Sequence, residues 1–363
     1  QANCLAVLGH QRLAPLRVAD EHWPLDRLPP HTILVAFSRR TVLHLKTELE
    51  RMKRKVSVIY GGLPPEVRRK QADRFAEGET EICVATDAVG MGLNLPADYV
   101  CFYEVEKFDG YRVRQLLPGE IHQIGGRAGR YGLRKTGEIG ATNKKDHSVV
   151  QKLFDQSIAP ITRARIAPSV EDLELLPGSL WERLAQWAQL QSIPESLREI
   201  IETADLTERT ELARMLTDEE VDQLGLNAAL KLVNAPTRQS SRQYWYSCAQ
   251  SILNGRSMPP PPQAPRRIQS SRDLEAAEQS ISCADIYLWL GSRREFNMFA
   301  LDEETVRYER ANWSIQIDEA LLRQLDTTRR CPECGRPLPL GHRHRLCDRC
   351  FFSQRQSNSY GHG

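Results

Sequence analysis

A repeated alternation of short apolar runs and helical stretches constrains the fold of this chain most strongly. Strand-like runs occupy residues 32–37, 56–60, 81–86 and 98–103. They are apolar at nearly every position, so neither face of such a strand suits water. Helical spacing of apolar residues fills 39–52 and 64–78, and the second stretch begins with proline and ends with glycine. Strands buried on both faces and alternating with helices predict a parallel sheet covered by helices.

The remainder of the chain divides by composition. Helical periodicity dominates 146–326, and the proline-rich segment 257–267 within it predicts an extended connector. Residues 327–352 are rich in Cys, Arg and His, and we expect the polar tail 353–363 to be disordered. A chain of 363 residues predicts several domains, here an α/β domain over 1–145, an all-α region and a small cysteine-rich module.

Charge and hydropathy limit the partners. The formal net charge is only +2, so any contact with nucleic acid must rest on local patches. The longest apolar runs are short, and we expect no membrane span. The sequence begins with Gln1 and carries no convincing signal peptide, so we expect it to be a piece of a longer protein.

The segment "ATDAVGMGLNLP" (85–96) directly follows a predicted strand. In open α/β sheets, ligands bind at the carboxyl ends of the strands. Thr86 and Asp87 can cap the next helical turn, whose free N–H groups suit a phosphate. The simpler alternative, a tight turn from strand to helix, is not excluded by this stretch alone.

The segment "QIGGRAGR" (123–130) combines glycines with two arginines. If the segment is helical, Arg127 and Arg130 lie on one face at a spacing of three residues. Arginine is suited to stabilising a transferring phosphoryl group, and Gln123 could orient a water or a neighbouring side chain. The alternative is a surface helix with solvated arginines, which leaves its glycines unexplained.

Together these segments resemble a known family. "VAFSRR", "VIYGGLPPEVRRKQADRF", "ATDAVGMGLNLP" and "QIGGRAGR", in this order, resemble motifs IV to VI in the second RecA-like domain of superfamily-two helicases. The pairing of "VIYGGLPP" with "ATDAVGMGLNLP" resembles, more narrowly, the suppressor-of-Var (Suv) RNA helicases of the mitochondrial degradosome and their bacterial relatives. The resemblance covers roughly residues 15–325 and includes "ADIYLWLGSRREFNMF" in the helical region.

The resemblance implies a role for each matching residue. Contacts to the nucleic-acid backbone are implied for Ser38, Arg39, Gly61, Gly62 and Thr86. Nucleotide contacts are implied for Asp87, Gly92 and Asn94. Catalytic groups that complete the ATP site are implied at Gln123, Arg127 and Arg130, with Arg130 as the arginine finger. Contacts to the nucleic-acid backbone hold the nucleic-acid strand without reading its base sequence.

The family pattern also requires a first RecA-like domain, which this sequence does not contain. No G-x-x-x-x-G-K-[ST] occurs anywhere, and "TDEEVDQ" (217–223) lies in a helical region rather than after a strand. ATP and Mg²⁺ would therefore be held largely by the missing domain, and we expect this chain alone not to hydrolyse ATP. The implied substrate is single-stranded or partly duplex RNA or DNA, and the degradosome likeness suggests an exoribonuclease partner. The implied location is the cytoplasm in a bacterium and the mitochondrion in a eukaryote.

Four cysteines form two C-x2-C knuckles twelve residues apart: Cys331, Cys334, Cys347 and Cys350. This spacing predicts a Cys4 zinc ribbon with a structural Zn²⁺. Such a small module has almost no core, so the metal would supply its folding energy. A redox pair or chance clustering is the alternative. The surrounding arginines suggest contact with a phosphate backbone or a protein partner.

Two alternatives concern the helical region and the whole chain. "RQYWY" (242–246) is either a base-stacking platform or part of a helical core, and the core is the favoured interpretation. The whole chain could instead be a non-catalytic zinc-ribbon adaptor that binds nucleic acid. A binding module would have no use for an arginine finger, which argues against the adaptor.

Overall fold

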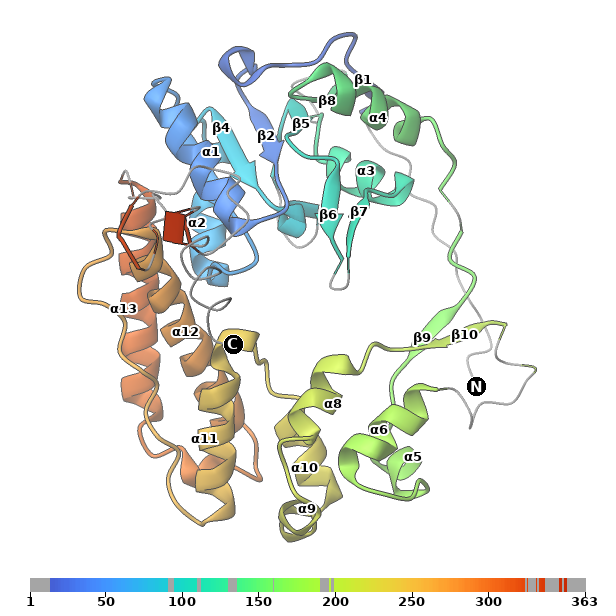
Figure 1. Cartoon of the computed structure of the whole chain (residues 1–363), viewed down its shortest axis with the longest axis vertical. Coiled ribbons are helices and arrows are strands. Elements are labelled where there is room, and N and C mark those ends of the chain that lie inside the picture. The colour runs from blue at the N-terminus through green and yellow to red at the C-terminus, as the bar shows by residue number, and fades with distance from the viewer. Residues whose placement is uncertain are drawn as a thin grey trace, which may run out of the picture.

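The computed structural model describes residues 14–90, 95–109, 112–129, 136–158, 160–189, 196, 199–323, 325, 331, 333–336, 346–347 and 349–350. An α/β part and a helical part lie one above the other (Figure 1). None of the helices in these ranges is long and apolar enough to cross a bilayer.

The predicted parallel sheet is confirmed. Its strands run in the order β1-β8-β5-β2-β4-β3, and every neighbouring pair is parallel. The strands are β1 (Leu16–Val18), β2 (Thr32–Val35), β3 (Val56–Ile59), β4 (Ile82–Ala85), β5 (Tyr99–Phe102) and β8 (Gly137–Ala141). Three-residue β1 and the glycine-rich β8 were not expected from the sequence. They extend the sheet beyond β5.

Successive residues of each strand enter opposite hydrophobic layers, as the pleat requires. Leu34 packs into the layer formed with α1 (Arg39–Arg51), whereas Ile33 and Val35 pack into the opposite layer. That second layer contains side chains of α2 (Pro65–Ala76), α3 (Pro118–Gly125) and α4 (Lys144–Phe154). Because Val150 and Leu153 of α4 belong to it, the α/β part extends to Phe154, beyond the expected boundary at 145.

Local signals set the helix ends. The Ser38 hydroxyl accepts a hydrogen bond from the Thr41 amide at 3.0 Å and so caps α1. Helix α2 begins at Pro65 and is followed by Gly78, whose φ of +80° ends the helical path. Ser270 and Asp273 form a capping box at the start of α12 (Ser271–Gly291).

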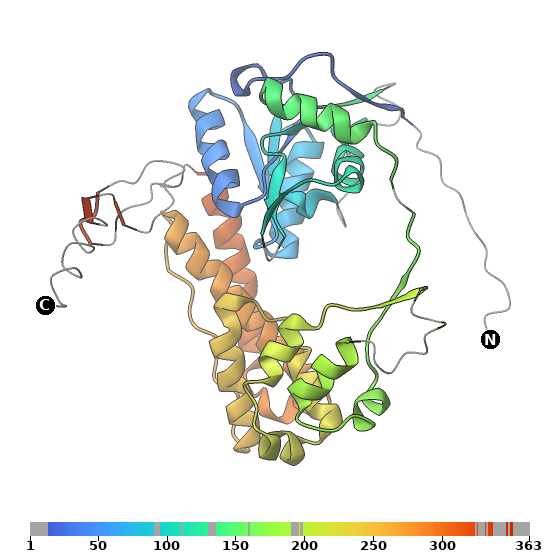
Figure 2. The same ribbon diagram turned by 45° about the vertical axis from the view of Figure 1, so that its right-hand side comes forward.

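The helical part is built mainly of short helices and one long pair, α12 and α13 (Glu303–Leu321), which runs beside α2 (Figures 1 and 2). The other helices are α5 (Val170–Glu174), α6 (Leu180–Ala188), α8 (Thr207–Ala213), α9 (Asp218–Leu224), α10 (Leu226–Val233) and α11 (Arg242–Leu253). The expectation of a purely helical region is wrong in one respect: β9 (Ala164–Ile166) and β10 (Ile201–Thr203) form a small parallel pair. The proline-rich connector contains neither helix nor strand over 256–265.

One hydrophobic core joins the two parts. The layer on the α1 side of the sheet continues without a break into the helical part, where it includes Trp245 and Tyr287. Trp245 is fully buried and its indole N–H donates to the Leu232 carbonyl at 2.9 Å. The core interpretation of "RQYWY" is therefore confirmed for Trp245, the middle one of its three aromatic residues.

Candidate nucleotide and nucleic-acid interface

The carboxyl edge of the sheet gathers the segments that the sequence singled out. Ser38 and Arg39 follow β2, Gly61 and Gly62 follow β3, and Thr86 follows β4. Since β2, β4 and β3 are neighbours, three segments far apart in the sequence meet along one edge. Whether they contact nucleic acid stays a prediction.

Two pairs of candidate residues lie at this edge, Ser38 with Arg39 and Gly61 with Gly62. In each pair the first residue faces outward and the second faces the helical part. Ser38 and Gly61 are exposed, and nothing lies within 4 Å of the place that a Cβ of Gly61 would occupy. A Cβ at Gly62 would instead lie 3.2 Å from the Glu278 carboxylate of α12. The Arg39 guanidinium also faces α12, with its Nε 2.9 Å from Glu278 Oε2.

Thr86 directly precedes the 3-10 turn η2 (Asp87–Gly90), and Asp87 is its first residue, so the expected helical turn is present in its 3-10 form. The Thr86 hydroxyl accepts a hydrogen bond from the Ala88 amide at 3.3 Å, which confirms the expected cap. Asp87 is half-exposed and its carboxylate lies 3.2 Å from Lys107 Nζ. Gly92 and Asn94 lie outside the described residues.

The segment "QIGGRAGR" is not one continuous helix. Helix α3 ends at Gly125, and Gly129 adopts a φ of +97°, so Arg127 lies in a turn beyond the helix. A glycine at 137 is needed for this path, because a Cβ there would lie 2.4 Å from the Ala128 carbonyl oxygen. The expected helix through Arg127 is therefore wrong. Arg130 lies outside the described residues, so a common face for the two arginines stays a prediction.

Arg127 and Gln123 nevertheless converge on the η2 turn. Arg127 Nη2 donates to the Gly90 carbonyl at 2.6 Å. The Gln123 side chain lies 3.6 Å from the place of a Gly90 Cβ. The guanidinium and the amide thus stand beside the turn that follows β4, and both groups can donate hydrogen bonds to an anion.

A charge cluster beside this turn was missed by the sequence reading. Glu120 on α3 accepts hydrogen bonds from both Arg114 terminal nitrogens at 2.9 Å and lies 2.7 Å from Lys107 Nζ. Burial disfavours this carboxylate, but the hydrogen bonds from Arg114, Lys107 and the Leu117 amide outweigh it and lower the pKa of Glu120 to about 2. The cluster fixes the hairpin of β6 (Glu106–Phe108) and β7 (Val113–Gln115) to α3.

Two further features lie near this edge. A cavity of about 500 Å³ is lined by Phe37, Ser38, Tyr103 and Phe108, among others. Arg68, in the first turn of α2, has its Nε buried without a hydrogen-bond partner. An arginine three residues after the proline that begins the helix is the only signal that the sequence gives for it.

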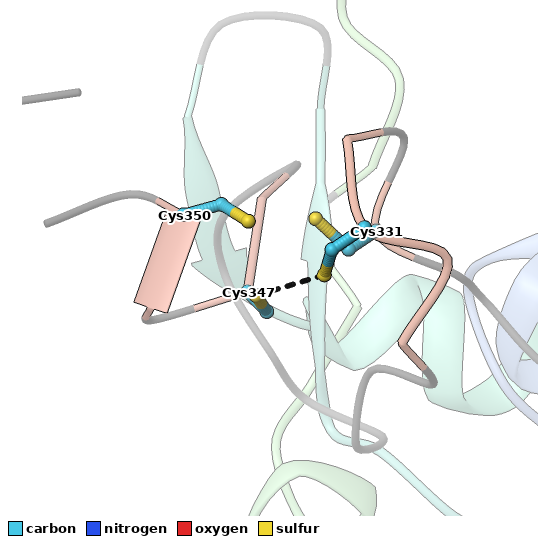
Figure 3. Close-up of side chains that lie close together, drawn as sticks. Cys331, Cys347 and Cys350 are labelled. Atoms are coloured by element: carbon cyan, nitrogen blue, oxygen red, sulfur yellow. Dashed lines mark hydrogen bonds between the residues drawn. The ribbon is translucent and has the colours of Figure 1, made fainter. Parts of the chain in front are cut away.

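The four cysteine thiols come together as predicted. All four sulfurs lie within 4.8 Å of one another, and those of Cys334 and Cys347 are 3.6 Å apart. Tetrahedral sulfurs 2.3 Å from Zn²⁺ would be about 3.8 Å apart, so the spacing fits this metal. The thiols of Cys331, Cys347 and Cys350 point toward one another (Figure 3).

Backbone amides surround the thiol of Cys331. Hydrogen bonds from the backbone N–H of Cys347, and from those of Cys334 and Glu333, lower the pKa of Cys331 to about 6 and so favour the thiolate that a metal requires. The Gly335 amide donates to the Cys331 carbonyl at 2.8 Å, with a φ of +67° at Gly335. Within the described ranges, these cysteines are the one cluster of at least three His, Cys, Asp or Glu side chains that could hold a metal ion.

Comparison with known proteins shows similarity to helicases. The family model "Helicase conserved C-terminal domain" matches residues 18–132. The chain is 37% identical over 169 residues to the ATP-dependent RNA helicase SUV3, mitochondrial, of Candida albicans, which covers 46% of this chain and 24% of that protein. It is 33% identical over 247 residues to SUV3 of Saccharomyces cerevisiae, covering 64% of this chain and 33% of that protein.

The similarity extends beyond the α/β part. The DExH-box ATP-dependent RNA helicase DExH16, mitochondrial, of Arabidopsis thaliana is 29% identical over 330 residues, which is 85% of this chain and 55% of that protein. The chain therefore spans about a quarter to a half of the length of these relatives. The matched domain and the parallel sheet give it the RecA-like fold of a helicase C-terminal domain.

Proposed function

Because the chain belongs to the SUV3-type helicase family and spans its C-terminal portion, we propose that it forms one half of an ATP-driven RNA helicase motor. One observation carries the proposal. Arg127 and Gln123 meet the η2 turn, and this turn lies on the same sheet edge as the exposed Ser38 and Gly61. A structural change at the proposed ATP site could thus reach the proposed nucleic-acid contacts through the short segment from Gly90 to Thr86.

The proposed roles follow from the chemistry of each side chain. Arg127 and Arg130 would stabilise negative charge on the phosphates, and Gln123 would orient a water. Asp87, Gly92 and Asn94 would contact the nucleotide. ATP supplies the phosphoryl group when bound, and Mg²⁺ would be held by a first RecA-like domain that carries the Walker motifs. This chain alone would not hydrolyse ATP.

The proposed substrate is single-stranded or partly duplex RNA, held by its phosphates at Ser38, Gly61 and Thr86. The named relatives are RNA helicases, which supports RNA over DNA. Translocation from 3′ to 5′ and association with an exoribonuclease follow from the family likeness. The relatives are mitochondrial, which supports that location for a eukaryotic source.

We also propose that the four cysteines bind a structural Zn²⁺. Four thiolates would fill a tetrahedral site and leave no open position for catalysis. The ribbon would then serve as an auxiliary contact to nucleic acid or to a partner protein.

The test is ATPase activity, with and without single-stranded RNA, for this chain and for the chain joined to a RecA-like domain that contains Walker A and DExH motifs. We expect RNA-stimulated hydrolysis only in the joined protein, reduced about 100-fold or more by Arg130→Ala or Arg127→Ala, because such arginines stabilise the transition state. Arg256→Ala, which removes an exposed arginine three residues beyond α11, is the control. Hydrolysis by the isolated chain would refute the half-site. Inactivity of both proteins, with RNA binding that requires zinc, would favour the adaptor.

A further inference from the structure

Glu278 is a buried carboxylate of the helical part whose hydrogen-bond partners lie in the α/β part. Its side chain is only 8% exposed. Its Oε1 accepts the Tyr60 hydroxyl at 2.6 Å, and its Oε2 lies 2.9 Å from Arg39 Nε. An unpaired carboxylate at this depth would be costly, so Glu278 depends on both partners. These partners belong to the two segments that follow β2 and β3.

Arg39 is largely committed to α12. Besides Glu278, its terminal nitrogens donate to the hydroxyl and the carbonyl of Ser271 at 3.3 and 3.2 Å. The guanidinium also lies 5.7 Å from the centre of the Tyr60 ring. A guanidinium has five N–H donors, and three nitrogens are already engaged here. Arg39 therefore acts as an anchor between α1 and α12 more readily than as a contact to a passing phosphate.

A second arginine of the helical part holds the loop after β3. Arg238 Nη1 donates to the Gly62 carbonyl at 3.0 Å, and its Nη2 donates to the Gly61 carbonyl at 3.1 Å. The segment that carries Arg238 is itself held by α12. The Gln279 amide donates to the Ser240 carbonyl at 2.8 Å, and Gln279 directly follows Glu278.

We propose that Glu278 and Arg238 are positioning residues for nucleic-acid binding: they hold the segments Ser38–Arg39 and Tyr60–Gly62 so that Ser38 and Gly61 face the strand. The inference rests on the proposed function for the identity of the ligand. It assigns to the helical part a role in shaping the nucleic-acid edge that the sequence does not show. Arg39 and Gly62 become the inward-facing anchors of the same two segments.

The test combines two measurements on the full chain and on Glu278→Gln, Arg238→Ala and Asp318→Asn. Asp318→Asn is the matched control, because Asp318 is also a buried carboxylate between the two parts but pairs with Arg74 of α2, further along that helix from the edge. Arg238 is exposed, so its replacement should leave the fold intact. All measurements are made at a temperature where every variant is folded.

Hydrogen exchange tests positioning without RNA. We expect Glu278→Gln and Arg238→Ala to speed amide exchange in 38–39 and 60–63, and Asp318→Asn to leave these amides unchanged. Equal protection in all variants, or loosening by Asp318→Asn as well, would overturn the inference.

Affinity for a labelled single-stranded RNA oligonucleotide tests the consequence. We expect Glu278→Gln to weaken binding about tenfold while Asp318→Asn does not. Tighter binding by Glu278→Gln would mean that Arg39, once released, is itself the phosphate contact, and would overturn the positioning role. If Glu278→Gln and Arg238→Ala loosen the two segments but the wild-type chain does not bind RNA, the proposed function would be contradicted and the anchoring of the two segments would stand.

Discussion

At the scale of single residues, Glu120 shows how one carboxylate can join three elements. It accepts the Leu117 amide at the start of α3, both terminal nitrogens of Arg114 on β7, and Lys107 on β6. Its side chain is 18% exposed, so solvent screens these charges only in part. The pKa of about 2 is the signature of this arrangement.

The low pKa of Glu120 predicts a pH dependence of stability. A carboxyl whose folded-state pKa lies below its ordinary value of 4.5 stabilises the fold above that pH, and the stabilisation is lost as the pH falls toward about 2. We expect Glu120→Gln to lower the free energy of unfolding by up to about 3 kcal/mol near neutral pH, and the difference from wild type to shrink below about pH 4.5. Urea unfolding at several pH values measures this. A difference that does not change with pH would contradict it.

Sequence reasoning placed the edge residues but could not orient them. Ser38 and Arg39 were correctly placed after a strand, because the apolar run 32–37 ends directly before Ser38 and helical spacing begins at residue 39. That Arg39 turns inward depends on Glu278, which lies 239 residues further along the chain. No local sequence pattern can indicate the contact between Arg39 and Glu278.

At the scale of elements, the two C-x2-C knuckles are the clearest case of a local pattern that the structure confirms. The spacing predicted that the thiols would meet, and they do.

The short strands were not predicted from the sequence, because they are too short to carry a local pattern. Strands β1, β9 and β10 have three residues each, too few to show a period of two. The end of α3 at Gly125 was also missed, because glycine signals a helix end only weakly within a run of several glycines.

The knuckles predict a metal-dependent fold for this element. We expect zinc to be present at about one ion per chain and a strong chelator to remove it, with loss of protection from proteolysis around 331–350 and little change in the helices of the rest of the chain. Elemental analysis and limited proteolysis measure the two effects. Cys331→Ser should reproduce the effect of the chelator. Unchanged protection after complete removal of zinc would show that the metal does not hold this element together.

At the scale of the whole molecule, the α/β and helical parts share one core and several buried polar contacts. Asp318 of α13 receives two hydrogen bonds from Arg74 of α2, both at 2.8 Å, and one from Gln71 at 3.1 Å. Burial disfavours its carboxylate, yet the bonds from Arg74 and Gln71 lower the pKa of Asp318. Lys46 of α1, almost fully buried, donates to the Arg323 carbonyl just beyond α13. The composition of the sequence predicted two separate domains here. It could not show that they share one core, because composition does not record which apolar faces pack against each other.

This shared core predicts that the two parts unfold together. Asp318→Ala leaves the Arg74 guanidinium, on a side chain that is only 19% exposed, without its carboxylate partner, which should cost about 3 kcal/mol. If the parts are one cooperative unit, amides of β2–β5 and of α11–α13 become exposed at the same urea concentration, and the substitution shifts both by the same amount. Hydrogen exchange with mass spectrometry at increasing urea measures both in one sample. Glu303→Ala, which removes an exposed ion pair within α13, is the control and should shift neither. Earlier exposure of α11–α13, with the sheet still protected, would mean that the helical part is an independent domain.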